Sequence, residues 1–154
     1  MESPVGRLTL VADGEGALCG LYVGDDPRGG GGWRRDPGPF REAVRQLEAW
    51  FAGERRAFDL PLALHGTSFQ RAVWSALLDV PYGTTTTYTA LAAAAGRPLA
   101  VRAAGAANGR NPISVVVPCH RVVGLDGRLR GYAGGTSAKA RLLDHERRVL
   151  GSTA

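Results

Sequence analysis

Apolar and polar residues alternate along the first 24 residues, on both sides of the sequence Asp-Gly-Glu-Gly. Leu8 and Leu10 precede this turn signal, and Leu21 and Val23 follow it. Such alternation around a glycine-containing turn is typical of a β-hairpin with one buried face. Cys19 has the same parity as Leu21 and Val23, so we expect its side chain to point inward as a small hydrophobe.

The pattern changes to a helical period after a glycine- and proline-rich segment at 25–39, which is typical of a surface loop. Apolar residues recur at positions 40, 44, 47 and 51, and Gly53 follows, so the sequence predicts a helix over 40–51. Residues 58–64 favour a strand that leads into a linker. We place a domain boundary near His65, which we expect to be exposed in this linker.

The second half of the chain is mostly helical in pattern. Thr67 and Gln70 have the spacing of a capping box, which predicts a helix that ends before Pro81. Two shorter helices follow, one ending at Gly96 and one beginning at Pro98. Two short helices joined around a glycine indicate a helix-turn-helix motif.

The second of these short helices consists mainly of alanine and glycine, with Arg102 as its one long side chain. Small residues let a helix lie close to a DNA groove. Tight packing between helices favours the same composition, and the sequence leaves both alternatives open. The predicted fold class is α+β: an N-terminal α/β domain with an antiparallel sheet at 1–65, and a mainly helical C-terminal domain with a winged-helix-like helix-turn-helix at 66–154.

An apolar run at 113–117 is followed, after one proline, by a cysteine and two basic residues. Pro118 separates this run from Cys119, His120 and Arg121. A buried cysteine is often only a small hydrophobe, but the polar side chains beside it need partners. Neighbours on a regular strand point to opposite faces. Either Pro118 therefore turns the chain or a water molecule bridges thiol and imidazole, and we favour the water.

The last predicted helix supplies a carboxylate for this segment. Glu146 falls among apolar residues on one face, formed by Leu142, Leu143, Val149 and Leu150. A carboxylate on an inward face needs a basic partner, and His120 is the natural candidate. Because a thiol needs a base to become nucleophilic at neutral pH, Cys119, His120 and Glu146 would form a nucleophile, a base and an orienting group.

A glycine-rich loop around Tyr132 lies between the cysteine and this helix. Glycines let backbone amides approach a ligand while the aromatic ring forms a wall, so the loop is a candidate pocket.

Charge and composition narrow the function. The net charge is +5 and nearly all the positive charge is arginine, which favours a polyanionic partner, although solubility and an arginine-rich genome would give the same balance. The sequence has neither a membrane-length apolar run nor a signal-peptide pattern. Two distant cysteines indicate reduced thiols in a cytoplasmic protein.

The motifs together resemble a known family, the O6-alkylguanine-DNA alkyltransferases, also called methylated-DNA–protein-cysteine methyltransferases. The resemblance covers nearly the whole chain and is carried by "GTSFQRAVWSALLDVPYGTTTTY", "RAAGAANGRNP", "VPCHRVV", "GYAGG" and "KARLLDHE". It implies single-turnover transfer of an alkyl group from O6 of a flipped guanine in double-stranded DNA to Cys119, with O4-alkylthymine as a second candidate substrate. It also implies a monomeric protein that uses no cofactor and does not bind a membrane. The zinc site of some members is not expected, because Cys19 is the only other cysteine.

The resemblance also assigns roles to individual residues. Cys119, His120 and Glu146 would be catalytic, and Tyr88 would crowd the 3′ phosphate and donate to guanine N3. Arg102 would fill the space left by the flipped base, and further DNA contacts would come from Arg97, Arg110 and Ala103. The substrate pocket would be formed by Asn111, Ser114, Val122, Tyr132, Ala133, Gly134 and Lys139.

Within this set the backbone amide of Ala133 would donate to O6, and the carbonyls of Cys119 and Val122 would accept from the exocyclic amine. Asn111 would tie the helix-turn-helix to the cysteine segment. The chain departs from the family pattern at Thr87, where a serine is usual, and at Arg97, which adds a charge before Pro98.

Three competing hypotheses use part of this pattern. A lesion-binding relative without transfer activity would typically lack the cysteine. An ordinary thiol hydrolase would need an oxyanion motif, which is not evident. A helix-turn-helix regulator would leave the set of Cys119, His120 and Glu146 unexplained.

Overall fold

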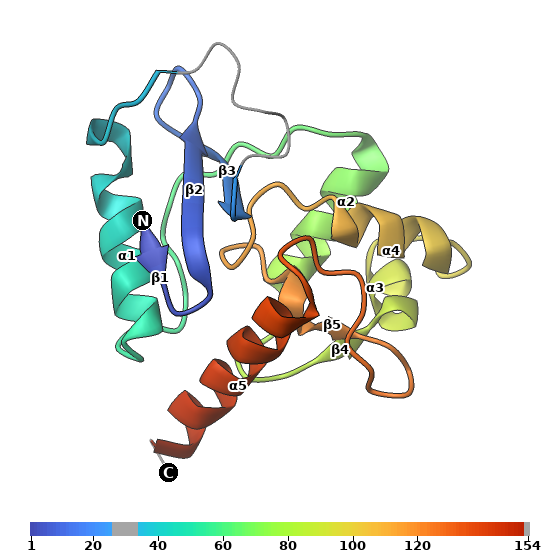
Figure 1. Ribbon diagram of the computed structural model, residues 1–154. Helices are drawn as coiled ribbons and strands as arrows, with labels where there is room; N and C mark the ends of the chain where they lie inside the picture. Colours follow the sequence, from blue (N-terminus) through green and yellow to red (C-terminus); the bar gives the residue numbers. More distant parts are fainter. Residues whose placement is uncertain (26–33, 153–154) are drawn as a thin grey trace.

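The computed structural model describes residues 1–25 and 34–152 of the 154-residue chain. Residues 26–33, which include most of the glycine-rich stretch of the loop predicted at 25–39, lie outside the described residues. Figure 1 shows a small sheet with one helix beside it, next to a group of helices from the second half of the chain. This arrangement is the α+β class that the sequence predicts.

The predicted hairpin is present as part of a three-stranded antiparallel sheet. Strands β1 (Glu2–Ser3), β2 (Gly6–Ala12) and β3 (Leu18–Val23) pair in the order β1-β2-β3. Leu8 pairs with Val23 and Leu10 with Leu21, and the register shifts between Val11 and Ala12.

This shift makes the expectation for Cys19 wrong. Leu18 is buried and Cys19 is only half-buried. An irregularity in the register changes which side chains of the partner strand face the core. Simple parity counted back from Leu21 therefore fails at Cys19.

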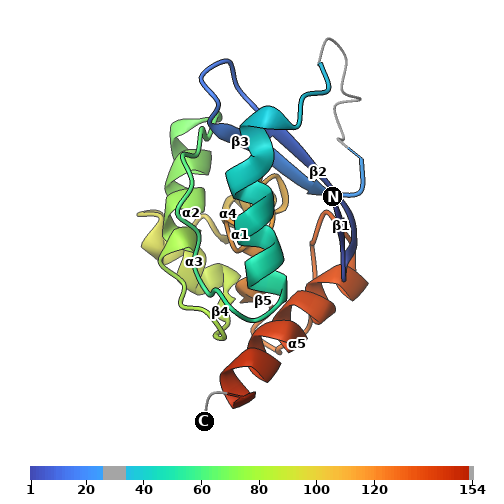
Figure 2. The same cartoon turned by 90° about the vertical axis from the view of Figure 1, so that its left-hand side faces the viewer.

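Helix α1 (Arg41–Phe51) follows a short turn, η1 (Gly38–Phe40), and lies beside the sheet with its C-terminal end directed toward α5, as Figure 1 and Figure 2 show. Its buried face differs from the predicted one: of the apolar positions 40, 44, 47 and 51 only Leu47 is buried, and the others are half-buried. Gln46 takes part in the buried face because its side-chain amide bonds with the backbone N–H and C=O of Asp59, both at 2.9 Å. Trp50 completes the face with no exposed surface.

The strand predicted over 58–64 is reduced to one parallel bridge between Leu18 and Leu62. The N–H of Leu18 donates to the carbonyl of Pro61, and the N–H of Ala63 donates to the carbonyl of Leu18. Proline at 61 has no N–H to extend the ladder. His65 is exposed, as predicted.

Three helices pack against one another in the second half: α2 (Ser68–Leu78), α3 (Tyr88–Ala94) and α4 (Val101–Gly109). The capping box of Thr67 and Gln70 is confirmed. Helix α4 begins at Val101 rather than Pro98, because residues 97–100 form a separate turn after Gly96, whose φ is +87°. The helix-turn-helix motif is therefore present, with a longer connection.

The chain ends with η2 (Cys119–Arg121), β5 (Val122–Val123) and α5 (Thr136–Ser152), and β5 pairs in parallel with β4 (Thr86–Thr87). One buried cluster joins Leu8, Leu21 and Trp50 of the first half to residues such as Leu77 and Leu142 of the second. Because the two halves share this core, the boundary between 65 and 66 stays a prediction. None of the described helices has the length and apolar character needed to cross a membrane.

Candidate active site and nucleic-acid interface

The segment before Cys119 is a series of turns and not a regular strand. Of the two alternatives, the turn at Pro118 is therefore present, although we favoured the bridging water. Val115 has a φ of +71°, and the N–H of Val116 donates to the carbonyl of Ser114 at 2.8 Å. This is the strained γ-turn, and a β-branched residue in this region costs about 1–3 kcal/mol. The N–H of Cys119 then donates to the carbonyl of Val117 across Pro118. Cys119 therefore begins a 3₁₀ turn, in which adjacent side chains do not have to point to opposite faces.

Asn111 fixes the geometry of this turn. Its Nδ2 donates to the carbonyl of Val117 at 2.8 Å, and its Oδ1 accepts from the N–H of Ile113 at 3.1 Å. The side chain is buried, so these bonds are not weakened by competition with water. Asn111 therefore connects the end of the helix-turn-helix to the backbone just before Cys119.

His120 and Glu146 meet as predicted, in the interior. His120 Nε2–H donates to Glu146 Oε2 at 2.5 Å, and neither side chain is exposed. Donation from Nε2 leaves Nδ1 of the neutral ring as an acceptor. This Nδ1 is buried and has no hydrogen-bond partner among the described residues.

Two further groups that the sequence analysis did not assign also hold Glu146. The Nε and Nη2 of Arg121 donate to the carboxylate, and Arg121 Nη1 donates to the carbonyl of Val80 at 2.7 Å. The backbone N–H of Gly83 donates to Oε1 at 2.9 Å. A basic residue inside an apolar stretch was a usable signal for Arg121, whereas no local pattern points to a backbone amide 63 residues from Glu146.

These contacts determine the charges at the site. Burial would raise the pKa of Glu146, but the hydrogen bonds from His120 and Arg121 outweigh it and lower the pKa to about 2. Burial lowers the pKa of His120, in opposition to Glu146, so the imidazole is neutral at pH 7. Burial raises the pKa of Cys119 to about 11, although Asn111 and Lys139 oppose the shift. The resting site therefore contains a thiol, a neutral base and a carboxylate.

Tyr88 and Lys139 share one hydrogen-bond acceptor. The Tyr88 hydroxyl donates to the carbonyl of Arg130 at 3.0 Å, and Lys139 Nζ donates to the same oxygen at 2.6 Å. Lys139 is fully buried, and its Nζ lies 5.9 Å from the centroid of the Tyr88 ring. Both donors therefore bind the backbone at the start of the glycine-rich loop.

The remaining predicted pocket residues lie in or beside this loop. Ser114, Val122 and Tyr132 are buried, and burial raises the pKa of the Tyr132 hydroxyl well above its usual value. Ala133 is exposed. Gly134 lies so close to strand β3 that an added β-carbon would come within 2.8 Å of Val23 Cβ.

Helix α4 has one buried and one exposed face. Ala104, Ala107 and Asn108 are buried, while Arg102, Ala103 and Arg110 are exposed. The small residues therefore serve tight helix packing on one side and leave a shallow surface beside Arg102 on the other. Arg97 is also exposed, and its guanidinium lies 5.1 Å from the centroid of the Phe69 ring.

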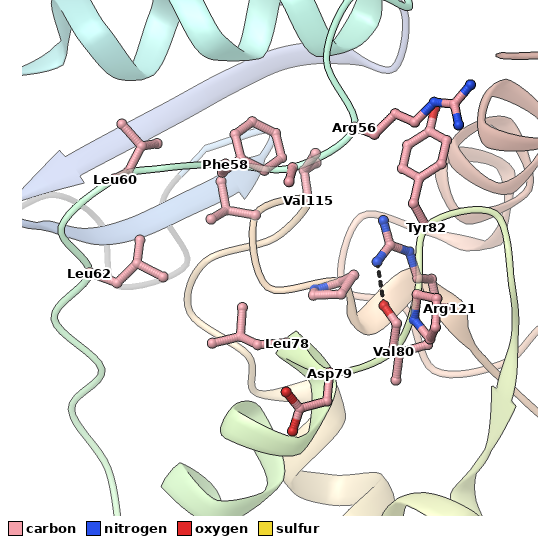
Figure 3. A pocket seen from close by; sticks show the side chains of 14 residues that line it. Arg56, Phe58, Leu60, Leu62, Leu78, Asp79, Val80, Tyr82, Val115 and Arg121 are labelled. Carbon is pink, nitrogen blue, oxygen red and sulfur yellow. Dashed lines mark hydrogen bonds between the residues drawn. The ribbon is translucent and has the colours of Figure 1, made fainter. Parts of the chain in front are cut away.

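A cavity of about 350 Å³ lies behind the cysteine segment, and Figure 3 shows its lining. Its walls come from three stretches, at 56–62, 78–82 and 115–121. Arg121 lines it, whereas Cys119 and Tyr132 do not. This cavity is therefore separate from the pocket predicted for the purine.

A helix-turn-helix unit followed by a buried thiol and an imidazole–carboxylate pair is the set of features expected of a DNA-binding protein that uses a cysteine. Comparison with known proteins gives the family. The model described as "6-O-methylguanine DNA methyltransferase, DNA binding domain" matches residues 68–148, and the one described as "6-O-methylguanine DNA methyltransferase, ribonuclease-like domain" matches residues 1–64. The chain belongs to this methyltransferase family.

Similar proteins carry a consistent name. A methylated-DNA–protein-cysteine methyltransferase of Methanosarcina barkeri is 46% identical over 97% of this chain and 96% of its own length. A protein of the same name from Mycobacterium bovis is 48% identical over 96% of this chain and 90% of its own length. The solved structure of Mycobacterium tuberculosis OGT in complex with DNA has a TM-score of 0.91 and 48% identity, covering 97% of this chain and 91% of that chain.

Proposed function

We propose that this protein repairs alkylated DNA by moving the alkyl group from O6 of a guanine to the sulfur of its own Cys119. The observation that carries the proposal is the joint placement of a buried thiol and a buried His120–Glu146 pair directly after a helix-turn-helix unit. Family membership supports the same conclusion. We place the reaction in the cytoplasm, in line with the reduced thiols expected from the sequence.

Binding begins on the exposed face of α4. Arg97, Arg102 and Arg110 supply positive charge for the phosphates, and Ala103 lets the helix approach the minor groove closely. Arg102 enters the base stack and takes the place of the extruded guanine. The base then lies against Tyr132, beneath the glycine-rich loop.

The transfer conserves atoms and charge. The thiol proton passes through a bridging water to Nδ1 of His120, while Glu146 holds Nε2–H and stabilises the imidazolium that forms. The sulfur attacks the alkyl carbon, the bond between this carbon and O6 breaks, and its electron pair stays on guanine. The Tyr88 hydroxyl protonates N3, and the backbone amide of Ala133 donates to O6.

Other groups hold the base during the step. The backbone carbonyls of Cys119 and Val122 accept from the exocyclic amine, and Asn111 keeps the cysteine turn in place through the carbonyl of Val117. Ser114 and Gly134 limit the width of the pocket, and Lys139 places a positive charge near the sulfur. Because a thioether has no simple route back to a thiol, each molecule acts once.

Intact-protein mass measurement after incubation with a methylguanine duplex tests this function. We expect the mass to increase by one methyl group, located on the peptide that contains Cys119. Cys119→Ser should remove the increase while the variant still binds DNA, and Cys19→Ser should leave it unchanged. Full lesion binding without a mass change would favour a lesion-binding protein, and transfer in Cys119→Ser would mean that another residue is the acceptor.

A further inference from the structure

A tryptophan from the first half of the chain packs against the imidazole of the candidate active site. Trp50 lies near the C-terminal end of α1 and has no exposed surface. Its ring centroid is 6.3 Å from that of His120, with the ring planes at 79°. The two residues are 70 positions apart in the sequence, so this contact joins the first domain directly to the catalytic set.

Trp50 is also attached to the helix that carries Glu146. Its backbone carbonyl accepts from His145 Nε2 at 2.9 Å, and the two rings lie 4.7 Å apart. His145 immediately precedes Glu146 on α5. Trp50 therefore contacts the imidazole on one side and the neighbour of the carboxylate on the other.

Aromatic neighbours hold the indole in place. Its ring lies 5.0 Å from Phe51, 6.2 Å from Phe58 and 6.1 Å from Tyr82. Phe58 and Tyr82 are also in the lining of the cavity behind the cysteine segment, which Figure 3 shows. The indole thus lies beside two side chains that line a cavity with room for water.

We propose that Trp50 is a positioning residue for alkyl transfer: its indole holds the His120 ring against Glu146 and keeps water away from it. The inference rests on the proposed function, and it gives the first domain a role in the chemistry that the sequence analysis did not foresee. An edge-to-face aromatic contact fixes both the distance and the tilt of the partner ring.

Loss of the indole should change the charge of the base. Burial is the main cause that lowers the pKa of His120. The charged groups around the ring are Glu146, which favours the imidazolium, and Arg121 and Lys139, which disfavour it. Water admitted beside the ring would remove much of the burial effect, so the pKa would rise and His120 would be protonated before Cys119 needs it as a base.

Trp50→Leu and Trp50→Phe test the proposal. In single-turnover transfer from a methylguanine duplex, Trp50→Leu should lose rate below the raised pKa of His120, by about tenfold for each pH unit below it, and should recover as the pH rises. Trp50→Phe keeps an aromatic edge against His120 and should show a smaller effect. Leu47→Ala, in the same helix and equally buried, controls for lost stability and should leave the pH profile in place.

An NMR titration of the His120 imidazole in the DNA-free protein gives an independent measurement. We expect the pKa to rise in the order wild type, Trp50→Phe, Trp50→Leu. Equal shifts in Leu47→Ala, or no shift in either Trp50 variant, would overturn the proposal; if Trp50→Leu does not fold, Trp50→Phe alone decides. A wild-type protein that transfers no methyl group would refute the proposed function, while this titration would still test the contact.

Discussion

At the scale of single residues, Glu146 is the point on which the interior polar groups converge. One carboxylate accepts from the buried imidazole of His120, from the buried guanidinium of Arg121 and from the backbone amide of half-buried Gly83. Buried ion pairs are stabilising only when each member keeps its partners, and loss of one member costs about 3–5 kcal/mol. The same residue therefore contributes to folding and to the orientation of His120.

Glu146→Gln is expected to lower the free energy of unfolding by several kcal/mol at pH 7, because Arg121 loses its anionic partner. The pH dependence should change as well. Since the pKa of Glu146 is lowered to about 2 from 4.5, its ionised form stabilises the fold above pH 4.5, and this contribution is lost as the pH falls toward 2. When the free energy of unfolding is measured by urea titration between pH 2 and 7, it should fall less steeply at acid pH (the acid limb of the curve) in the variant than in the wild type.

Glu48→Gln provides the control for this experiment, because Glu48 is exposed on α1. Its acid limb should match that of the wild type. If Glu146→Gln also unfolds with an unchanged acid limb, the carboxylate is not the group that is protonated there.

At the scale of elements, the glycine-rich loop depends on close contact with the N-terminal sheet. Gly134 packs against Val23 of β3 and against the ring of Tyr132. We expect Gly134→Ala to cost about 1–3 kcal/mol, because the added methyl group overlaps atoms that have little room to move. Transfer should slow as well, since the loop moves relative to Cys119; thermal unfolding and single-turnover rates measure the two effects.

Gly127→Ala separates steric overlap from backbone strain. Gly127 has a φ of +77° and nothing within 4 Å of an added β-carbon. This variant should lose about 1 kcal/mol from the backbone alone and keep its transfer rate. Comparable transfer rates in the two variants would contradict a role for the contact between Gly134 and β3.

The sequence predicts elements well where the signal is local and poorly where distant contacts decide. The capping box at Thr67 and the hairpin of β2 and β3 follow from spacing. So does the face of α5 that carries Glu146, except that Leu150, which was expected on this face, is exposed. The burial of Cys19 and the buried face of α1 do not, because a register shift and the bonds of Gln46 with Asp59 override simple periodicity. The partner of His120 was predictable because a buried carboxylate needs a base. The indole contact was not predictable, because it joins residues 70 positions apart in the sequence.

At the scale of the whole molecule, the positive charge has two expected uses on DNA. Arg102 in the first turn of α4 and Arg110 directly after its last residue are both exposed. We expect Arg110→Ala to weaken binding at all sequences and to reduce the slope of log affinity against log salt by about 1, because one phosphate contact is lost.

Arg102→Ala should differ from Arg110→Ala by impairing extrusion more than general affinity. Fluorescence of 2-aminopurine beside the lesion reports unstacking, and fluorescence anisotropy reports binding at several salt concentrations. If the two variants lose extrusion and affinity in the same proportion, Arg102 does not act as a wedge.

The enclosure of Cys119 also bears on how long the protein can wait for a lesion. Peroxide and glutathione disulfide react with thiols in proportion to their thiolate fraction and accessibility. Cys119 is 5% exposed and its pKa is raised to about 11. Both its accessibility and its thiolate fraction are therefore small while no nucleobase occupies the pocket. A protein that is consumed by a single event thereby retains its sulfur for DNA damage instead of losing it to the redox chemistry of the cell.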